Sequence, residues 1–188
     1  MPLWGATDSD ESKPKHLTTA QKKEVFANAS GWVVEAGSTQ SGNGNTSADP
    51  EILVAIGGLA SSIGAADITE IEFITTAFDK SDGGTLQVRV RFNEAVDVSG
   101  TPQLTVVNDT NSNHTLSYAS GTGTNESVFS LTIAAGNAAT DAGDVLSIGT
   151  NAMALNSGTV KDAGTSDNAT ITNSSAIGTA AGTITVSA

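Results

Sequence analysis

The stretch TLQVRVRF, residues 85–92, alternates apolar and polar side chains without a break. In a β-strand successive side chains point to opposite faces, so this period of two predicts a strand with one buried face and one polar face. The buried face would be formed by Leu86, Val88, Val90 and Phe92, and the polar face by Gln87, Arg89 and Arg91. It is the clearest strand pattern in the chain.

The same period recurs on both sides of this stretch, between turns rich in glycine. Strands are expected at 70–76, around Leu104 and Val106, around Leu116 and Tyr118, and at 129–133, with weaker candidates at 145–148, 169–172 and 183–186. Short alternating strands with frequent turns are typical of an antiparallel β-sandwich. We therefore predict a mainly β chain with such a sandwich at residues 68–188.

The first 60 residues have a different character. We expect an extended arm to about residue 15, then a helix at 20–29 that begins with the capping-box pattern Thr18-x-x-Gln21. Strands are expected at 32–35 and 52–56, with Asn43-Gly44 as a favoured hairpin dipeptide between them. Residues 57–67 are mostly small, so a flexible linker is expected at 61–67. The arm, helix and hairpin of residues 1–60 are too small to bury much alone, which indicates a docking segment.

Composition and charge narrow the function classes. The chain has 188 residues, no cysteine, 8 Lys and Arg against 20 Asp and Glu, and a net charge of −12. Of this charge, −3 falls in residues 1–60 and −9 in residues 61–188. Such an acidic chain repels phosphate backbones and anionic lipids, so we expect no nucleic-acid or membrane partner. We also expect no secretory signal and no membrane-spanning segment.

The sequence offers little catalytic or metal-binding chemistry. His16 and His114 stand in no Ser/His/Asp or His-x-x-x-His pattern, and Glu94 has no catalytic partner visible in the sequence. Six aspartates lie in turns, where a calcium site is one interpretation and ordinary turn formation the favoured one. They are Asp79, Asp82, Asp141, Asp144, Asp162 and Asp167. We expect no catalytic residue, cofactor or metal, and a protein that is not an enzyme.

Candidate partner-binding residues concentrate near the N-terminus. Tryptophan is enriched in interface hot spots, and lysines can meet an acidic patch. We predict partner contacts for Leu3, Trp4, Lys13, Lys15 and Trp32. For Trp32, burial in a local core is an equally open alternative. For Arg89 and Arg91, cross-strand pairing with residues such as Glu126 is favoured over contact with an acidic partner.

Three ordered motifs lie in residues 86–162. They are Val88-x-Val90-x-Phe92-x-Glu94-x-Val96-x-Val98 followed by Gly100-Thr101-Pro102, the turn Tyr118-Ala-Ser-Gly121-Thr-Gly123 before Phe129-Ser-Leu131, and Leu155-Asn156-Ser-Gly158-Thr-Val160-x-Asp162. Together they resemble a bacterial Ig-like repeat family found in large surface proteins. The resemblance implies an Ig-like sandwich. After Asp162 the chain departs from the family's usual Gly-Asn turn.

The N-terminal segment carries a second set of motifs. They are WGATDSDESKPKHL at 4–17, GWVVE at 31–35 and EILVAI at 51–56. In order and spacing they resemble small virion structural proteins of T4-like cyanobacterial phages. The two resemblances together imply a phage virion protein that carries one Ig-like module.

The leading hypothesis is a capsid decoration or cement protein on the capsid surface of the virion. Residues 1–60 would dock on the major capsid protein or another virion protein, with self-association on the capsid, and the Ig-like domain would face outward. One alternative keeps the protein in the virion but at the neck or tail. Another is a carbohydrate-binding adhesion module, for which Tyr118 and Phe78 are the aromatic residues near predicted loops.

Overall fold

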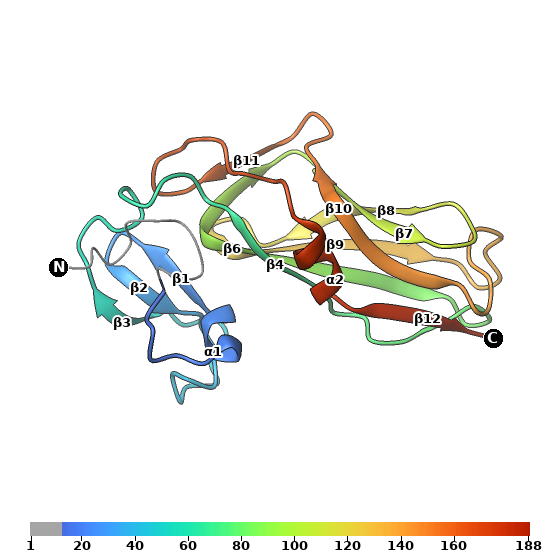
Figure 1. Cartoon of the computed structure of the whole chain (residues 1–188), viewed down its shortest axis with the longest axis horizontal. Helices are drawn as coiled ribbons and strands as arrows, with labels where there is room; N and C mark the ends of the chain where they lie inside the picture. Colours follow the sequence, from blue (N-terminus) through green and yellow to red (C-terminus); the bar gives the residue numbers. More distant parts are fainter. Residues whose placement is uncertain (1–12) are drawn as a thin grey trace.

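The computed structural model describes residues 13–188, which form a mainly β fold as predicted. Figure 1 shows two parts: a long sandwich, and a smaller body at one end that contains the first three strands and the first helix. We call residues 13–65 the N-terminal unit and residues 66–188 the sandwich. The strands of the sandwich run along the long axis of the molecule (Figure 1).

Strand β6 (Gly84–Ser99) is the central strand of the sandwich, and it contains the alternating residues 85–92. The predicted alternation is confirmed, because all four apolar side chains of residues 86–92 are at most 1% exposed. One edge of β6 pairs with β9 (Thr124–Ile133). The other edge pairs in turn with β4 (Ile68–Phe73), with β1 (Val25–Asn28) and with β11 (Thr159–Asp162). Both parts of the molecule therefore meet on one strand.

The remaining strands continue the sheet beyond β9. They are β8 (His114–Ser120), β7 (Gln103–Asn108), β10 (Val145–Ala154), β12 (Thr183–Ser187) and β5 (Phe78–Asp79), in that order. Helix α2 (Ser175–Ala180) contacts both β10 and β4, which lie far apart in the strand order, so the sheet folds over around one core. The expected strand at 169–172 is wrong, since only isolated bridges form there, such as Asp67 with Thr170.

Helix α1 (Thr19–Lys23) begins with the predicted capping box. Thr18 Oγ1 accepts a hydrogen bond from Gln21 N at 3.2 Å, and Gln21 Oε1 accepts one from Thr18 N at 2.9 Å. The predicted extent to residue 29 is wrong, because residues 25–28 form strand β1, which pairs with β2 (Gly31–Val34). Sheet pairing buries Val25, Phe26 and Ala27, which an isolated helix would leave exposed on one side.

The turn between β1 and β2 is followed by a glycine, Gly31, at a position that no other residue could occupy. Asn28 Oδ1 accepts hydrogen bonds from Ser30 N at 2.8 Å and from Gly31 N at 3.2 Å. Gly31 has a φ of 138°, and a Cβ at this position would lie 2.0 Å from the carbonyl oxygen of Val54. Only glycine allows β3 (Glu51–Ala55) to approach β2 this closely.

The hairpin and linker predictions for the N-terminal unit need correction. Strands β2 and β3 are joined by a long loop, so Asn43-Gly44 lies within that loop and is not a two-residue hairpin turn. The segment 57–67 does connect the two parts, but it is packed rather than free: Leu59 is 1% exposed and Ile63 is 4% exposed. Both side chains complete a small core with Val25, Ala27, Trp32 and Val34.

Candidate interaction site

The structure separates the predicted partner-binding residues. Leu3 and Trp4 lie outside the described residues. Lys15 is exposed, whereas Lys13 is buried and its Nζ donates a hydrogen bond to the carbonyl oxygen of Lys22 at 2.9 Å. Lys13 therefore serves the C-terminal end of α1, where a cation is favourable, and the prediction that it contacts a partner is not supported.

Trp32 is buried in a local core, which is the alternative that the sequence left open. Its side chain is 0% exposed and packs in the small core of the N-terminal unit. Its Nε1 is buried and has no hydrogen-bond partner among the described residues. The indole thus acts as the largest apolar group of this core, and its prediction as a partner contact is corrected.

A network of charged side chains joins the N-terminal unit to the sandwich, next to the point where Ala27 of β1 pairs with Glu94 of β6. We call it the junction cluster; its members are Lys23, Glu35, Glu70, Glu72, Arg89, Arg91 and Glu126. Four carboxylates and three cations leave it with one net negative charge. Lys23 and Glu35 come from the N-terminal unit, and the other five come from β4, β6 and β9.

Arg91 is the centre of this cluster. Its Nη1 lies 3.0 Å from Glu70 Oε2 and 3.1 Å from Glu72 Oε2, and its Nε lies 2.7 Å from Glu126 Oε1 and 3.5 Å from Glu35 Oε1. The side chain is only 8% exposed. Burial alone would lower the pKa of Arg91, but the surrounding carboxylates, Glu35 first, raise it above its ordinary value. The guanidinium therefore stays charged and ties both parts together.

The predicted pairing of the two arginines with Glu126 is confirmed, since Arg89 Nη1 also lies 3.0 Å from Glu126 Oε1. Sequence reasoning missed Glu70 and Glu72. Both alternate with the apolar residues Ile71 and Phe73, so they belong to the polar face of β4, opposite the arginines of β6. That alternation was a usable signal. The sequence contains no such signal for Glu35, because Glu35 lies in a loop that is distant in the sequence from the other members of the cluster.

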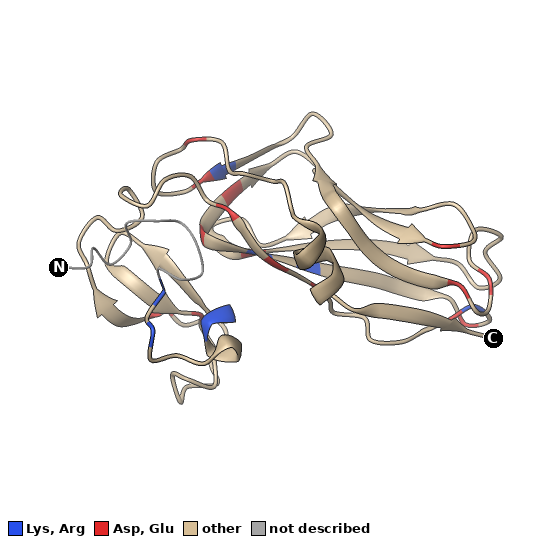
Figure 2. Cartoon of the chain, in the orientation of Figure 1, with Lys and Arg blue, Asp and Glu red and all other residues tan. Residues whose placement is uncertain are grey.

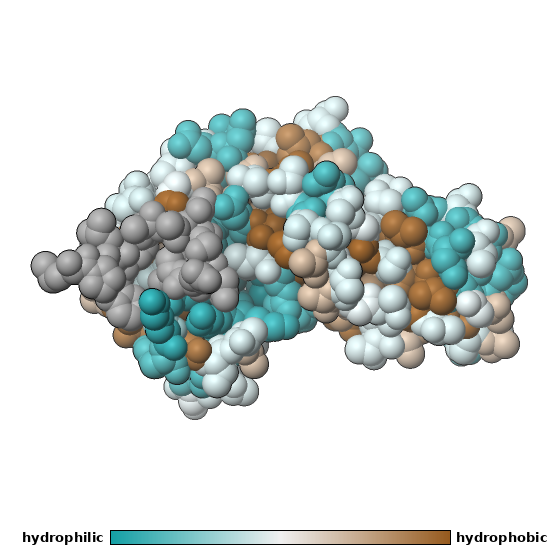
Figure 3. Space-filling model, viewed as in Figure 1, coloured by the Kyte–Doolittle hydropathy of each residue, from teal (hydrophilic) through white to brown (hydrophobic). Residues whose placement is uncertain are grey.

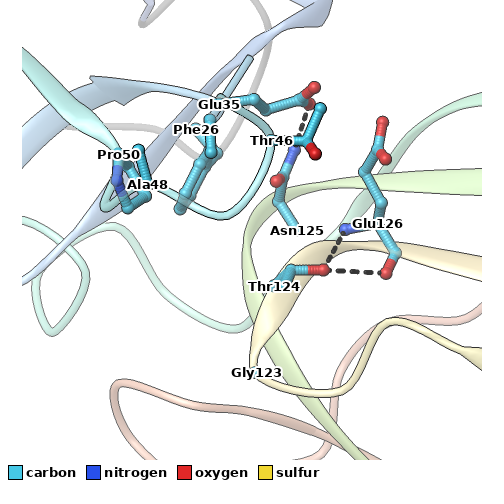
Figure 4. Close-up of a pocket in the computed structure, with 10 residues that line it drawn as sticks. Phe26, Glu35, Thr46, Ala48, Pro50, Gly123, Thr124, Asn125 and Glu126 are labelled. Carbon is cyan, nitrogen blue, oxygen red and sulfur yellow. Dashed lines mark hydrogen bonds between the residues drawn. The ribbon is translucent and has the colours of Figure 1, made fainter. Parts of the chain in front are cut away.

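A small cleft of about 260 Å³ lies beside the junction cluster, between the two parts (Figure 4). Phe26, Glu35 and Pro50 line it from the N-terminal unit, and Thr124 and Asn125 line it from β9. Glu35 Oε1 accepts a hydrogen bond from Asn125 Nδ2 at 2.8 Å. Burial raises the pKa of the Glu35 carboxyl, in spite of Asn125 and Arg91. Glu35 and Asn125, one from each part of the molecule, are hydrogen-bonded to each other. The cleft is therefore part of the contact between the N-terminal unit and the sandwich.

The far end of the sandwich holds a second polar cluster, centred on Asp144. Its Oδ2 accepts hydrogen bonds from Asn108 Nδ2 at 2.6 Å and from the Asp141 amide at 2.8 Å, and its Oδ1 accepts one from the Thr110 hydroxyl. Burial alone would raise the pKa of Asp144, but these donors hold it well below its ordinary value. Both carboxylate oxygens of Asp144 therefore accept hydrogen bonds from N–H and O–H donors, as is usual for an aspartate in a turn.

The other residues considered for chemistry also have ordinary partners. His114 is buried, with Nε2 3.2 Å from Thr140 Oγ1, and burial lowers its pKa. His16, in contrast, is exposed. Within residues 13–188, no three His, Asp or Glu side chains gather where they could hold a metal ion.

The two aromatic residues considered for a sugar platform do not present open rings. Phe78 is 5% exposed. Tyr118 is half-buried, its ring packs edge-on against Phe129 with centroids 6.0 Å apart, and its hydroxyl accepts a hydrogen bond from Thr122 N at 2.7 Å. Apolar side chains do reach the surface in small separate patches on the face drawn in Figure 3, most of them over the sandwich.

Comparison of the chain with protein-family models, with curated proteins and with solved structures finds no match. Neither α1 nor α2, the helices of the described part of the chain, has the length and apolar character needed to cross a bilayer.

Proposed function

We propose that this chain is a structural protein of a tailed-phage virion, of the kind found in T4-like cyanobacterial phages. It docks on the major capsid lattice through its N-terminal segment and displays the sandwich outward, as a decoration or cement protein. The single observation that carries the docking direction is the charge division of the molecule. Residues 1–60 carry a net charge of −3, whereas residues 61–188 carry −9.

This division favours one end as the attachment end. Figure 2 shows lysines in the N-terminal unit and acidic residues in the loops at the opposite end of the sandwich. Sandwiches that carry −9 repel one another, so a crowded array would hold them outward and apart. The junction cluster supports the same arrangement, because it fixes the N-terminal unit to the sandwich.

The mechanism of such a protein is mass action. A molecule that binds the assembled shell and not its dissociated subunits stabilises the shell by its binding free energy. Repetition of the same contact over a symmetric lattice adds these free energies. Leu3, Trp4 and Lys15 remain the proposed contacts, with Trp4 as the apolar anchor.

The test removes the protein from purified virions and adds it back. Wild type should rebind, a fragment of residues 66–188 should not, and Trp4→Ala should rebind weakly. Trp32→Phe is the matched control, since it alters a tryptophan in the internal core, and it should rebind like wild type. Rebinding of the fragment at wild-type strength would show that the sandwich is the attachment element.

The same particles distinguish the capsid from the neck or tail. An antibody against the sandwich should label the whole head in electron micrographs, and mass spectrometry should give a high copy number. Label at one vertex or along the tail would move the protein to that location while keeping its structural role.

A further inference from the structure

Strand β3 is an open edge of the sheet. It stands at the end of the strand order, and within residues 13–188 no further strand pairs with its outer side. Its side chains are unusually apolar for that position: Ile52 is 55% exposed and Leu53 is 36% exposed. Natural proteins commonly protect such edges with charged residues, proline, β-bulges or a covering segment, because an open apolar edge pairs with other strands. Strand β3 contains no lysine.

The sequence of β3 is complementary to itself in the antiparallel direction. If two copies pair about Leu53, Leu53 faces its own copy, Ile52 faces Val54, and Glu51 faces Ala55. The apolar residues then meet each other, and the two glutamates are not opposite one another. Pairing with β2 leaves Leu53 without an opposite residue, because the register shifts between Ile52 and Val54.

The charge distribution allows a second copy of this chain to approach at the N-terminal end. Residues 1–60 carry a net charge of −3 and residues 61–188 carry −9, so two molecules approach with less repulsion through their N-terminal ends than through their sandwiches. Figure 1 shows β3 at the end of the molecule opposite the far loops of the sandwich. Pairing through β3 therefore keeps the two acidic sandwiches apart.

We propose that two copies of this chain pair edge to edge through β3, in antiparallel orientation about Leu53, and form a continuous sheet across their N-terminal units. The contact goes beyond docking, because it joins copies of this chain and requires no shell. In an array on a capsid it would link neighbouring molecules in pairs.

The first experiment measures association of the purified full chain by sedimentation equilibrium. Wild type should show a concentration-dependent dimer. Ile52→Lys should weaken dimerisation by about tenfold or more, which corresponds to about 1.4 kcal/mol. Ile74→Lys is the matched control, because Ile74 is 39% exposed on the sandwich, and it should dimerise like wild type. A monomer at all concentrations, or equal weakening by both variants, would overturn the proposal.

The second experiment tests the register. Directly opposed residues of antiparallel strands have Cα atoms about 4.5–5.5 Å apart, within the range of a disulfide. The chain has no cysteine, so Leu53→Cys introduces a single thiol. Oxidation should give a disulfide-linked dimer, and far-UV circular dichroism should verify the fold. Leu155→Cys, at a site 40% exposed on the sandwich, is the control. Equal cross-linking of both variants would indicate random collision and contradict the β3 contact.

Discussion

The two parts of the molecule differ most in their cores. The sandwich buries twenty-two apolar residues in one cluster, whereas the core of the N-terminal unit has six buried members among the described residues. A body as small as the N-terminal unit buries too little apolar surface to be stable alone. It therefore depends on Trp32 inside and on the junction cluster outside. The contrast indicates that one part folds independently and the other folds against it.

The largest expected loss of stability comes from substitutions in the cores of the two parts. Phe92→Ala should destabilise the sandwich by about 3–5 kcal/mol, because the ring is 1% exposed in the main core. Trp32→Ala should leave the sandwich transition unchanged and remove hydrogen-exchange protection from β1 and β2. Trp32→Phe should retain that protection, since it keeps an apolar ring and removes an unpaired N–H. Urea unfolding and hydrogen exchange measure both. Equal loss of sandwich stability in Phe92→Ala and Trp32→Ala would mean that the parts unfold as one.

The next effect tests the connection between the parts. Arg91→Met should cost about 3 kcal/mol, because it leaves buried carboxylates without their shared cation. Arg89→Met is the matched control on the same strand; Arg89 is 27% exposed and has no ion pair with Glu35, so the loss should be about 1 kcal/mol or less. Hydrogen exchange should show opening of the N-terminal unit in Arg91→Met first. Equal losses in the two variants would remove Arg91 from the centre of the cluster.

A smaller effect belongs to the far end of the sandwich. Asp144→Asn should cost about 1.5–3 kcal/mol, because an amide cannot accept all the hydrogen bonds that the carboxylate accepts. The folded pKa of Asp144 is lowered, so its contribution is present above the unfolded pKa of about 3.9 and is lost as the pH falls below it. Thermal melts of wild type and variant should converge in that acid range. Asp141→Asn, at an exposed side chain of the same loop, should lose less.

The smallest effect concerns the start of α1. Thr18→Ala removes the capping hydrogen bond to Gln21 N and should destabilise the N-terminal unit by about 1 kcal/mol. Thr19→Ala changes a neighbouring exposed threonine inside the helix and should be nearly neutral. Hydrogen exchange of residues 19–28 should report the difference. A shift of the sandwich transition in Thr18→Ala would contradict the conclusion that the sandwich folds independently of the N-terminal unit.

Period-two patterns predicted the sandwich well because each strand buries one face. The strand at 85–92 and the pairing of its arginines with Glu126 follow from side-chain alternation alone. The same reasoning extended the helix through Val25–Asn28, because a local pattern contains no information about pairing with β2 and β6. Burial of Leu59 and Ile63 could not be predicted from the sequence either, because the small residues that flank them are typical of a flexible linker. The position of Glu35 beside Arg91 depends on tertiary contact over a long sequence distance.

The way β6 is shared between the two parts has a mechanical consequence. The N-terminal unit joins β6 through one bridge, Ala27 with Glu94, whereas β9 pairs along most of its length. The sandwich strands run along the long axis (Figure 1), so tension between the two ends would load many of their hydrogen bonds in shear at once. Between the two parts, the single bridge, the ion pairs and the Glu35–Asn125 hydrogen bond would carry the same load. A stretched molecule should therefore yield at this joint and lengthen there, while the sandwich remains intact.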